Sequence, residues 1–249
     1  MSVSSDQFLQ FFRGTSPYIH AHRGKTLVVY LSGEALENGG RELIHDLALL
    51  RSLGLRLVVV FGTRLQVSEA FDREDLPENF HGSLRVTTAD SLQTVVAAAQ
   101  SVLVRLQAEF STGLVNSPMH GASVRTVSGN YVYAKPQGIL DGVDFQYTGA
   151  VRSIAGKDIC HQLDAGNIVL VPPYGFSVTG ELFNLSALEV AQQCAHAVQA
   201  DKLVIVGNIS ALPAPEEQGQ FTPHELRQHL ELMAPESAGY PEFESALLA

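Results

Sequence analysis

The sequence contains few cysteines and few charged residues, and both shortages exclude classes of protein. Its two cysteines, Cys160 and Cys194, are too few and too far apart for a disulfide framework or a zinc site, so two reduced thiols are expected. Charged residues make up 17% of the chain, against about 25% in typical domains. This low share argues against a disordered protein and against a coiled coil.

Basic residues and long apolar runs are also scarce. Lysine and arginine number 16 against 26 aspartates and glutamates, a net charge of −10 that repels phosphate backbones and argues against a nucleic-acid partner. The longest apolar runs, such as residues 57–61, fall far short of the ~20 residues that span a bilayer. The start of the chain has neither the basic nor the apolar region of a signal peptide. We therefore expect a cytoplasmic protein with no membrane partner.

The 249 residues include 45% hydrophobic residues, enough for a sizeable core, and their pattern alternates between strands and helices. Continuous apolar runs predict buried strands of a parallel sheet at 27–31, 57–61, 168–171 and 203–206. Helices are predicted at 6–19 (ending near Pro17), 41–53, from an Asp90–Gln93 capping box to about 107, 158–165, 186–199 and from Thr222 onward. A hairpin is predicted over 122–134, with 143–154 pairing beside it.

This pattern predicts a single α/β domain over residues 1–249. Its body would be an open, mostly parallel central sheet with helices on both faces and a β-hairpin insertion. Residues 1–24 would form a helical arm ahead of the body at 25–249.

Common catalytic and metal-binding motifs do not match. Gly24-Lys25-Thr26 resembles the end of a phosphate-binding loop, but position 19 holds isoleucine where that motif needs glycine, and the strand follows the motif instead of preceding it. The histidines do not have the helical spacing of metal ligands: His20 with His22, and His224 with His229. No metal site is expected.

The loops at the carboxyl ends of the predicted strands form the best candidate for a binding site, because ligands of open α/β sheets bind there. These loops are 32–34, 62–64, 173–175 and 207–208. Each glycine taken alone is explained by its turn, whereas four such loops at one edge favour a cleft for an anionic ligand. Gly33 and Gly62 would allow a ligand to approach the backbone closely. Arg64 and Arg85 could clamp a carboxylate of that ligand.

Beyond these patterns, the sequence resembles a known family. The segments run in the order seen in the amino-acid-kinase fold over residues 8–232: PYIHAHRGKTLVVYLSGEAL, LRSLGLRLVVVFGTR, SLRVTTAD, GVDFQYTGAVRSI and GELFNLSALEVA, then ADKLV. Within that fold, residues 128–130 followed by 142–145 and 148–152 resemble the N-terminal domain of bacterial N-acetylglutamate synthases. The acetylglutamate kinases share the fold without this stretch. The resemblance implies a three-layer, amino-acid-kinase-like domain.

Three departures from the kinase pattern imply that phosphoryl transfer is lost. Tyr30 stands where the kinases have the lysine that neutralises the phosphoryl group, and Arg64 replaces part of a glycine-rich turn. Where the kinases have an Asn-x-Asp motif, this sequence has Asn184-Leu185-Ser186, so a serine replaces the aspartate. Because phosphoryl transfer is almost wholly electrostatic and positional, losing such groups costs orders of magnitude. Arg85 matches the arginine that holds the substrate carboxylate in the kinases, and it is either a relic or a packing residue.

The resemblance also implies a regulatory role. Tyr18 matches the tyrosine of an N-terminal arm that helps to close an L-arginine site and links dimers into a hexamer in arginine-sensitive relatives. Packing of the arm, with Phe8, Phe11 and Phe12, onto its own domain is the alternative. The resemblance places the glutamate N-acetyltransferase chemistry, with acetyl-CoA as co-substrate, in a further domain after Ala249. It therefore implies an incomplete C-terminal end and no catalytic residue or bound cofactor in this chain.

Several alternatives remain open from the sequence. The sequence could come from a truncated protein, from a gene fragment or from a degenerate stand-alone copy of the domain. Instead of a regulatory domain of the arginine biosynthesis enzyme, it could be a kinase that phosphorylates an N-acyl amino acid with ATP. A third alternative is a non-catalytic oligomerisation module.

Overall fold

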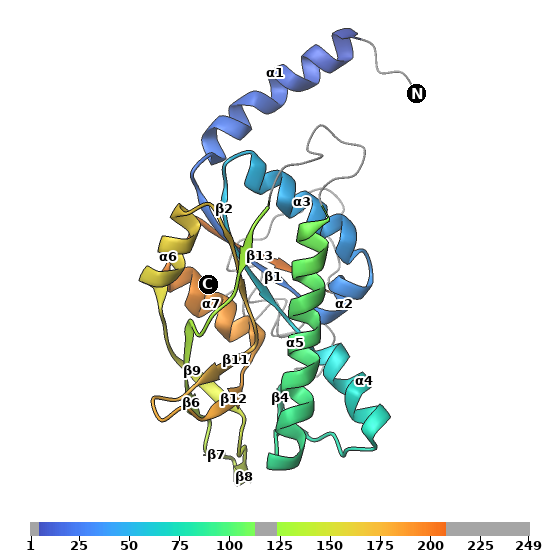
Figure 1. The fold of residues 1–249 in the computed structure, drawn as a ribbon, viewed down its shortest axis with the longest axis vertical. Helices are drawn as coiled ribbons and strands as arrows, with labels where there is room; N and C mark the ends of the chain where they lie inside the picture. The colour runs from blue at the N-terminus through green and yellow to red at the C-terminus, as the bar shows by residue number, and fades with distance from the viewer. Residues whose placement is uncertain (1–4, 113–123, 208–249) are drawn as a thin grey trace.

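The structure is a computed structural model that describes residues 5–112 and 124–207 (Figure 1). Its centre is a five-stranded sheet in the order β13-β1-β2-β10-β5, and every neighbouring pair is parallel. The bounds of its strands are β1 Thr26–Leu31, β2 Arg56–Phe61, β5 Thr126–Val127, β10 Ile168–Val171 and β13 Lys202–Val206. The expected parallel sheet and its four apolar strands are confirmed.

Helices cover both faces of this sheet, as expected (Figure 1). Side chains alternate along each strand, so Val29 and Val59 face one layer while Val28 and Val58 face the other. The first layer contains α3 Gly40–Ser52 and α5 Ala89–Ser111, and the second contains α6 Gly156–Asp164 and α7 Ala187–Ala197. Burial on both faces explains why these strands read as continuous apolar runs.

Two short helices follow β1 and β2 directly. These are α2, Gly33–Glu37, and α4, Arg64–Glu74. Val67 and Phe71 of α4 are buried with Val95 of α5 in a small cluster separate from the main cores. The chain therefore turns into a helix at the carboxyl end of each of these strands, and α5 supports the second of those helices.

A second, four-stranded sheet packs beside the first, in the order β12-β11-β6-β9. Its strands are β6 Val132–Pro136, β9 Gly149–Ile154, β11 Tyr174–Phe176 and β12 Leu182–Asn184. Two small antiparallel hairpins complete the described chain: β3 Phe80–His81 with β4 Leu84–Arg85, and β7 Ile139–Leu140 with β8 Val143–Asp144.

The hairpin predicted at 122–134 is wrong. Residues 126–127 pair in parallel with β10 at the edge of the central sheet, whereas β6 belongs to the second sheet. Val132 and Ala134 of β6 are buried against the α7 layer, so the segment between β5 and β6 leads from one sheet to the other. The predicted pairing with 143–154 is confirmed in part, because β9 is antiparallel to β6.

Two helix termini also differ from the prediction. The cap of α5 is Thr88, which exchanges side-chain and backbone hydrogen bonds with Ser91, so the Asp90–Gln93 box is wrong. Helix α1 runs from Ser5 to His22 through Pro17. A proline lacks the N–H that would bond to the carbonyl four residues earlier, and its ring crowds that carbonyl, which is why the sequence predicts a helix end near Pro17. The helix nevertheless continues past Pro17, and the backbone N–H of Arg23 donates to Ile19 O over 3.0 Å. The helix predicted from Thr222 lies outside the described residues.

Candidate functional site

The carboxyl ends of the central strands meet at one edge, because the strands are parallel. There the Ser32 N–H donates to Val206 O over 2.8 Å, and the Gly62 N–H donates to Leu31 O over 2.7 Å. The first residues of the loops after β1 and β2 therefore bond to the ends of β13 and β1 at this edge. Asn208 of the last predicted loop lies outside the described residues.

Gly33 and Gly62 lie where the two edge loops pack closely together. A Cβ on Gly62 would stand 2.9 Å from the Tyr30 hydroxyl and 3.4 Å from Gly33 N. A Cβ on Gly33 would stand 2.7 Å from Gln66 Oε1. Neither glycine adopts a positive φ, so the turn alone does not demand glycine. The two loops touch, and the buried Tyr30 fills the space beneath Gly62.

A polar cluster beside Gly33 joins α2, α4 and α5. Gln66 Nε2 donates to Gly33 O over 3.1 Å and to Glu37 Oε1 over 2.8 Å, and Arg105 Nη1 also donates to Glu37 Oε1 over 2.8 Å. The hydrogen bond from Gln66, with that from Arg105, lowers the pKa of Glu37 against an opposing effect of burial. Sequence reasoning missed this cluster, because its three members are far apart in the chain.

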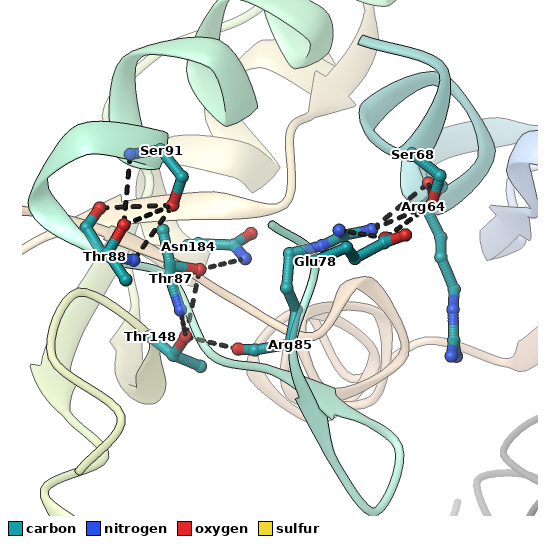
Figure 2. A network of polar contacts seen from close by, with 9 residues as sticks. All are labelled: Arg64, Ser68, Glu78, Arg85, Thr87, Thr88, Ser91, Thr148 and Asn184. Carbon is teal, nitrogen blue, oxygen red and sulfur yellow. Dashed lines mark hydrogen bonds and ion pairs between the residues drawn. The ribbon is translucent and has the colours of Figure 1, made fainter. Parts of the chain in front are cut away.

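Arg85 lies on β4 with a buried guanidinium that bonds within the chain. It forms an ion pair with Glu78 through Nη1 (Figure 2). Its Nη2 lies 3.3 Å from Ser68 Oγ and 3.4 Å from Arg64 O. Burial lowers the pKa of Arg85, and the charge of Glu78 opposes that effect. These contacts favour the packing role among the two that the sequence left open.

Two phenylalanines flank the Arg85 guanidinium. Its central carbon lies 4.9 Å from the ring centre of Phe71 and 4.7 Å from that of Phe80. Such contacts add attraction from the ring quadrupole. Arg64 lies at the start of α4, and its guanidinium carbon lies 4.5 Å from the same Phe80 ring. Its exposed side chain extends away from the Arg85 ion pair (Figure 2).

Asn184 joins this region through a chain of buried hydroxyl groups. Its Nδ2 donates to Thr87 Oγ1 over 2.9 Å, and that atom lies 3.0 Å from Thr148 Oγ1. Thr148 Oγ1 donates to Arg85 O over 2.5 Å and accepts from the Thr87 N–H over 3.0 Å (Figure 2). The network ties β12, β4 and the turn before β9 together.

The structure thus places the predicted residues in three groups. Gly33 and Gly62 touch at the sheet edge, and Arg64 begins the helix that follows Gly62. Arg85 contacts the Arg64 carbonyl and connects to Asn184 through the two threonines. Tyr18 lies apart on α1, which extends away from the body (Figure 1), and its side chain is 70% exposed.

The described residues offer neither a metal-binding cluster nor a membrane-spanning helix. Across 5–112 and 124–207, no group of three or more His, Cys, Asp or Glu side chains is arranged to hold a metal ion. Within the same two ranges, no helix is long and apolar enough to cross a membrane.

The fold is that of a known class of proteins. The amino acid kinase family matches residues 25–215, and the chain belongs to this family. It is 42% identical over 228 residues to the amino-acid acetyltransferase of Ectopseudomonas mendocina (strain ymp), a match that covers 90% of this chain and 52% of that protein. It is 44% identical over 205 residues to the enzyme of the same name from Serratia proteamaculans (strain 568), covering 82% and 46%. The chain spans about half the length of these curated relatives.

Solved structures agree with this relationship. The N-acetylglutamate synthase of Neisseria gonorrhoeae, in a complex with coenzyme A and L-arginine, matches with a TM-score of 0.85 and 33% identity, covering 97% of this chain and 57% of that one. A carbamate kinase from Giardia, 13% identical with a TM-score of 0.59, shares the fold alone. The predicted resemblance to the kinase-like part of the synthases is therefore confirmed.

Proposed function

We propose that this chain is the regulatory and assembly part of an N-acetylglutamate synthase, which senses L-arginine and has no kinase activity. The whole protein would form N-acetyl-L-glutamate from acetyl-CoA and L-glutamate in the cytoplasm, as a step of arginine biosynthesis. The observation that carries the proposal is the match of 97% of this chain to a synthase whose structure contains L-arginine and coenzyme A. No catalytic residue is assigned to the described part of the chain, and we expect it to bind no cofactor.

The loss of kinase activity is supported by the edge loops. The buried Tyr30 packs beneath Gly62, where the resemblance to the kinases calls for a lysine. Tyrosine carries no positive charge to neutralise a phosphoryl group, and that electrostatic contribution is central to this chemistry. Incubation with ATP, N-acetyl-L-glutamate and hydroxylamine should give no acyl hydroxamate. Steady ATP-dependent hydroxamate formation would overturn this part of the proposal.

The role in assembly is supported by the arm. Helix α1 extends from the body (Figure 1), and its Leu9 and Tyr18 side chains are exposed. A projecting helix with exposed apolar side chains offers a surface on which another subunit can pack. We propose that this arm links copies of the chain into a homo-oligomer, which the family resemblance implies is a hexamer. Sedimentation of the chain without residues 1–24 should give a smaller particle than the full chain. An unchanged mass would overturn the role of the arm.

The regulatory role is tested by a titration with L-arginine. The melting temperature of the full chain should rise with L-arginine and saturate, because a ligand that binds only the folded state stabilises it. L-Lysine at the same concentrations serves as the control for charge and ionic strength. An equal response to both amino acids, or none, would overturn the proposal.

A further inference from the structure

The junction between α2 and α3 (Figure 1) contains the single asparagine–glycine pair of the sequence, Asn38-Gly39. Asparagine is among the chemically labile residues of proteins. The carbon of its side-chain amide can be attacked by the backbone nitrogen of the next residue, and a glycine there has no Cβ to hinder the approach. The pair therefore has the composition of a deamidation site, and its surroundings in the fold decide whether the folded chain can react.

The fold leaves this pair open to water. Asn38 and Gly39 are both exposed, although Leu36 and Gly40 on either side of them are buried. Asn38 ends α2, and Gly39 follows with a φ of 108°, a conformation that glycine adopts without strain. A Cβ on Gly39 would meet Glu42 Oε2 at 3.9 Å, an ordinary contact distance. The space around the pair therefore leaves its two residues room to rearrange.

The attacking nitrogen is not held by a hydrogen bond. The Asn38 N–H donates to Glu34 O over 3.0 Å and so completes the last turn of α2. Across residues 5–112 and 124–207, by contrast, no acceptor bonds to the Gly39 N–H. A backbone N–H that donates to a carbonyl must lose that bond before its nitrogen can attack, and Gly39 does not pay this cost.

Two other asparagines show the opposite arrangement. The N–H that follows Asn167 donates to Arg125 O over 2.9 Å, and the N–H that follows Asn184 donates to Pro173 O over 2.9 Å. The side-chain amides of both asparagines are hydrogen bonded as well. The fold therefore protects these two asparagines on both sides of the reacting bond, which makes them internal controls for Asn38.

We propose that Asn38 is a site of spontaneous deamidation in the folded chain, with water as the co-reactant. The Gly39 nitrogen loses its proton and forms a bond to Asn38 Cγ. The Cγ–Nδ2 bond breaks, and Nδ2 leaves as ammonia with an equivalent proton. Water then adds across one of the two C–N bonds of the cyclic imide. Opening at Cγ gives aspartate, and opening at the backbone carbonyl carbon gives isoaspartate.

The two products differ in their effect on the fold. Aspartate places a carboxylate just ahead of Gly40, the first residue of α3, where the helix dipole favours negative charge. Isoaspartate lengthens the main chain by one atom directly after Glu37, whose carboxylate accepts from Gln66 and Arg105. The aspartate product therefore keeps the packing of α2, whereas the isoaspartate product disturbs the contacts of α2 with α4 and α5.

Incubation of the full chain at pH 8 and 37 °C, followed by digestion and mass spectrometry, tests the proposal. Asn38 should exchange its amide for a carboxylate at a rate within roughly tenfold of that in urea, because the fold protects it little. Asn167 and Asn184 should stay intact in the folded chain. Loss of the Asn38 amide only in urea would overturn the proposal, and so would equal rates at all three positions in the folded chain.

Two variants assign the reaction to the pair. Gly39→Ala should slow the loss of the amide by roughly tenfold, because its Cβ hinders the approach of the nitrogen. Alanine is strained at this φ, so Asn38→Gln is the second variant, and its longer side chain must close a larger ring and should stay amidated. Rates that match the unaltered chain in both variants would overturn the proposal.

The products are compared after separation by ion exchange. The isoaspartate fraction should melt roughly 2 °C or more below the unaltered chain. Asn38→Asp has the same charge and a normal main chain, so it is the matched control and should melt close to the unaltered chain. Equal melting of the isoaspartate fraction and Asn38→Asp would overturn the inferred effect on α2.

Discussion

The Tyr30 hydroxyl lies 2.9 Å from the place where a Cβ of Gly62 would stand. This relationship joins the interior of β1 to the loop after β2, at the sheet edge where the fold places its candidate site. The tyrosine ring fills the space there and brings no positive charge. Tyr30 therefore explains why position 62 holds a glycine, and its lack of charge supports the proposed loss of phosphoryl transfer.

Gly62→Ala tests this packing. The added methyl group must displace a buried tyrosine, so we expect a loss of about 1–3 kcal/mol in the free energy of unfolding. Tyr30→Phe removes the atom nearest to that methyl group, so the double variant should lose less than the sum of the two single variants. Urea denaturation measures all three, and strictly additive losses would contradict the contact.

Thr148→Val tests the buried hydroxyl network. The substitution leaves Arg85 O and the Thr87 N–H without the hydroxyl that serves both. Unpaired buried polar groups cost about 1–3 kcal/mol each, so a large fall in unfolding free energy is expected. Thr148→Ser keeps the hydroxyl and is the matched control. Equal stability of the valine and serine variants would show that the network contributes little.

We expect the free energy of unfolding to depend on pH through the partly buried carboxyl group of Glu189. Burial raises the pKa of its carboxyl group, and the hydrogen bond from the Val151 N–H opposes that effect. The folded chain thus holds this proton more tightly than the unfolded chain, so the contribution of Glu189 to stability falls as pH rises from the ordinary glutamate pKa through the raised one.

Glu189→Gln should remove that contribution. The amide Oε1 can still accept from the Val151 N–H, but it carries no charge to bury. Unfolding free energies measured from pH 4 to 8 should fall less with rising pH in the variant than in the unaltered chain. Glu69→Gln, at an exposed position, should keep the original slope. Identical slopes for all three proteins would refute the assignment.

The two cysteines should differ in reactivity. Burial raises the pKa of the Cys194 thiol to about 12, whereas Cys160 is partly exposed. The thiolate is the reactive form, so iodoacetamide at pH 8 should label Cys160 before Cys194, and Cys194 should react readily only in denaturant. Mass spectrometry of digested protein gives both rates. Comparable labelling of the native chain at both sites would contradict the burial of Cys194.

Much of the fold could be predicted because its strands are buried on both faces. Residues 57–61 are almost wholly inaccessible, and that burial leaves a continuous apolar run in the sequence. The hairpin at 122–134 was wrong because two short strands separated by a turn resemble a local pair. Their actual partners, β10 and β9, lie farther along the chain, and the burial of Val132 against α7 has no local signal.

The candidate site was predictable only in part. Glycines after strands pointed to the sheet edge, and the structure brings Gly33 and Gly62 into contact there. The ion pair between Arg85 and Glu78 could not be predicted, because Glu78 lies in a loop. No regular spacing in the sequence relates the two residues. Arg105 of α5 meets Glu37 of α2 only because both helices pack against α3 and α4, which sequence patterns do not report.

Calorimetric titration of the full chain with L-arginine tests the central claim most directly. The account predicts saturable binding heat for L-arginine and none for L-lysine or N-acetyl-L-glutamate at the same concentrations. Absence of arginine heat, with binding of N-acetyl-L-glutamate and ATP in its place, would contradict the regulatory assignment and restore the kinase alternative.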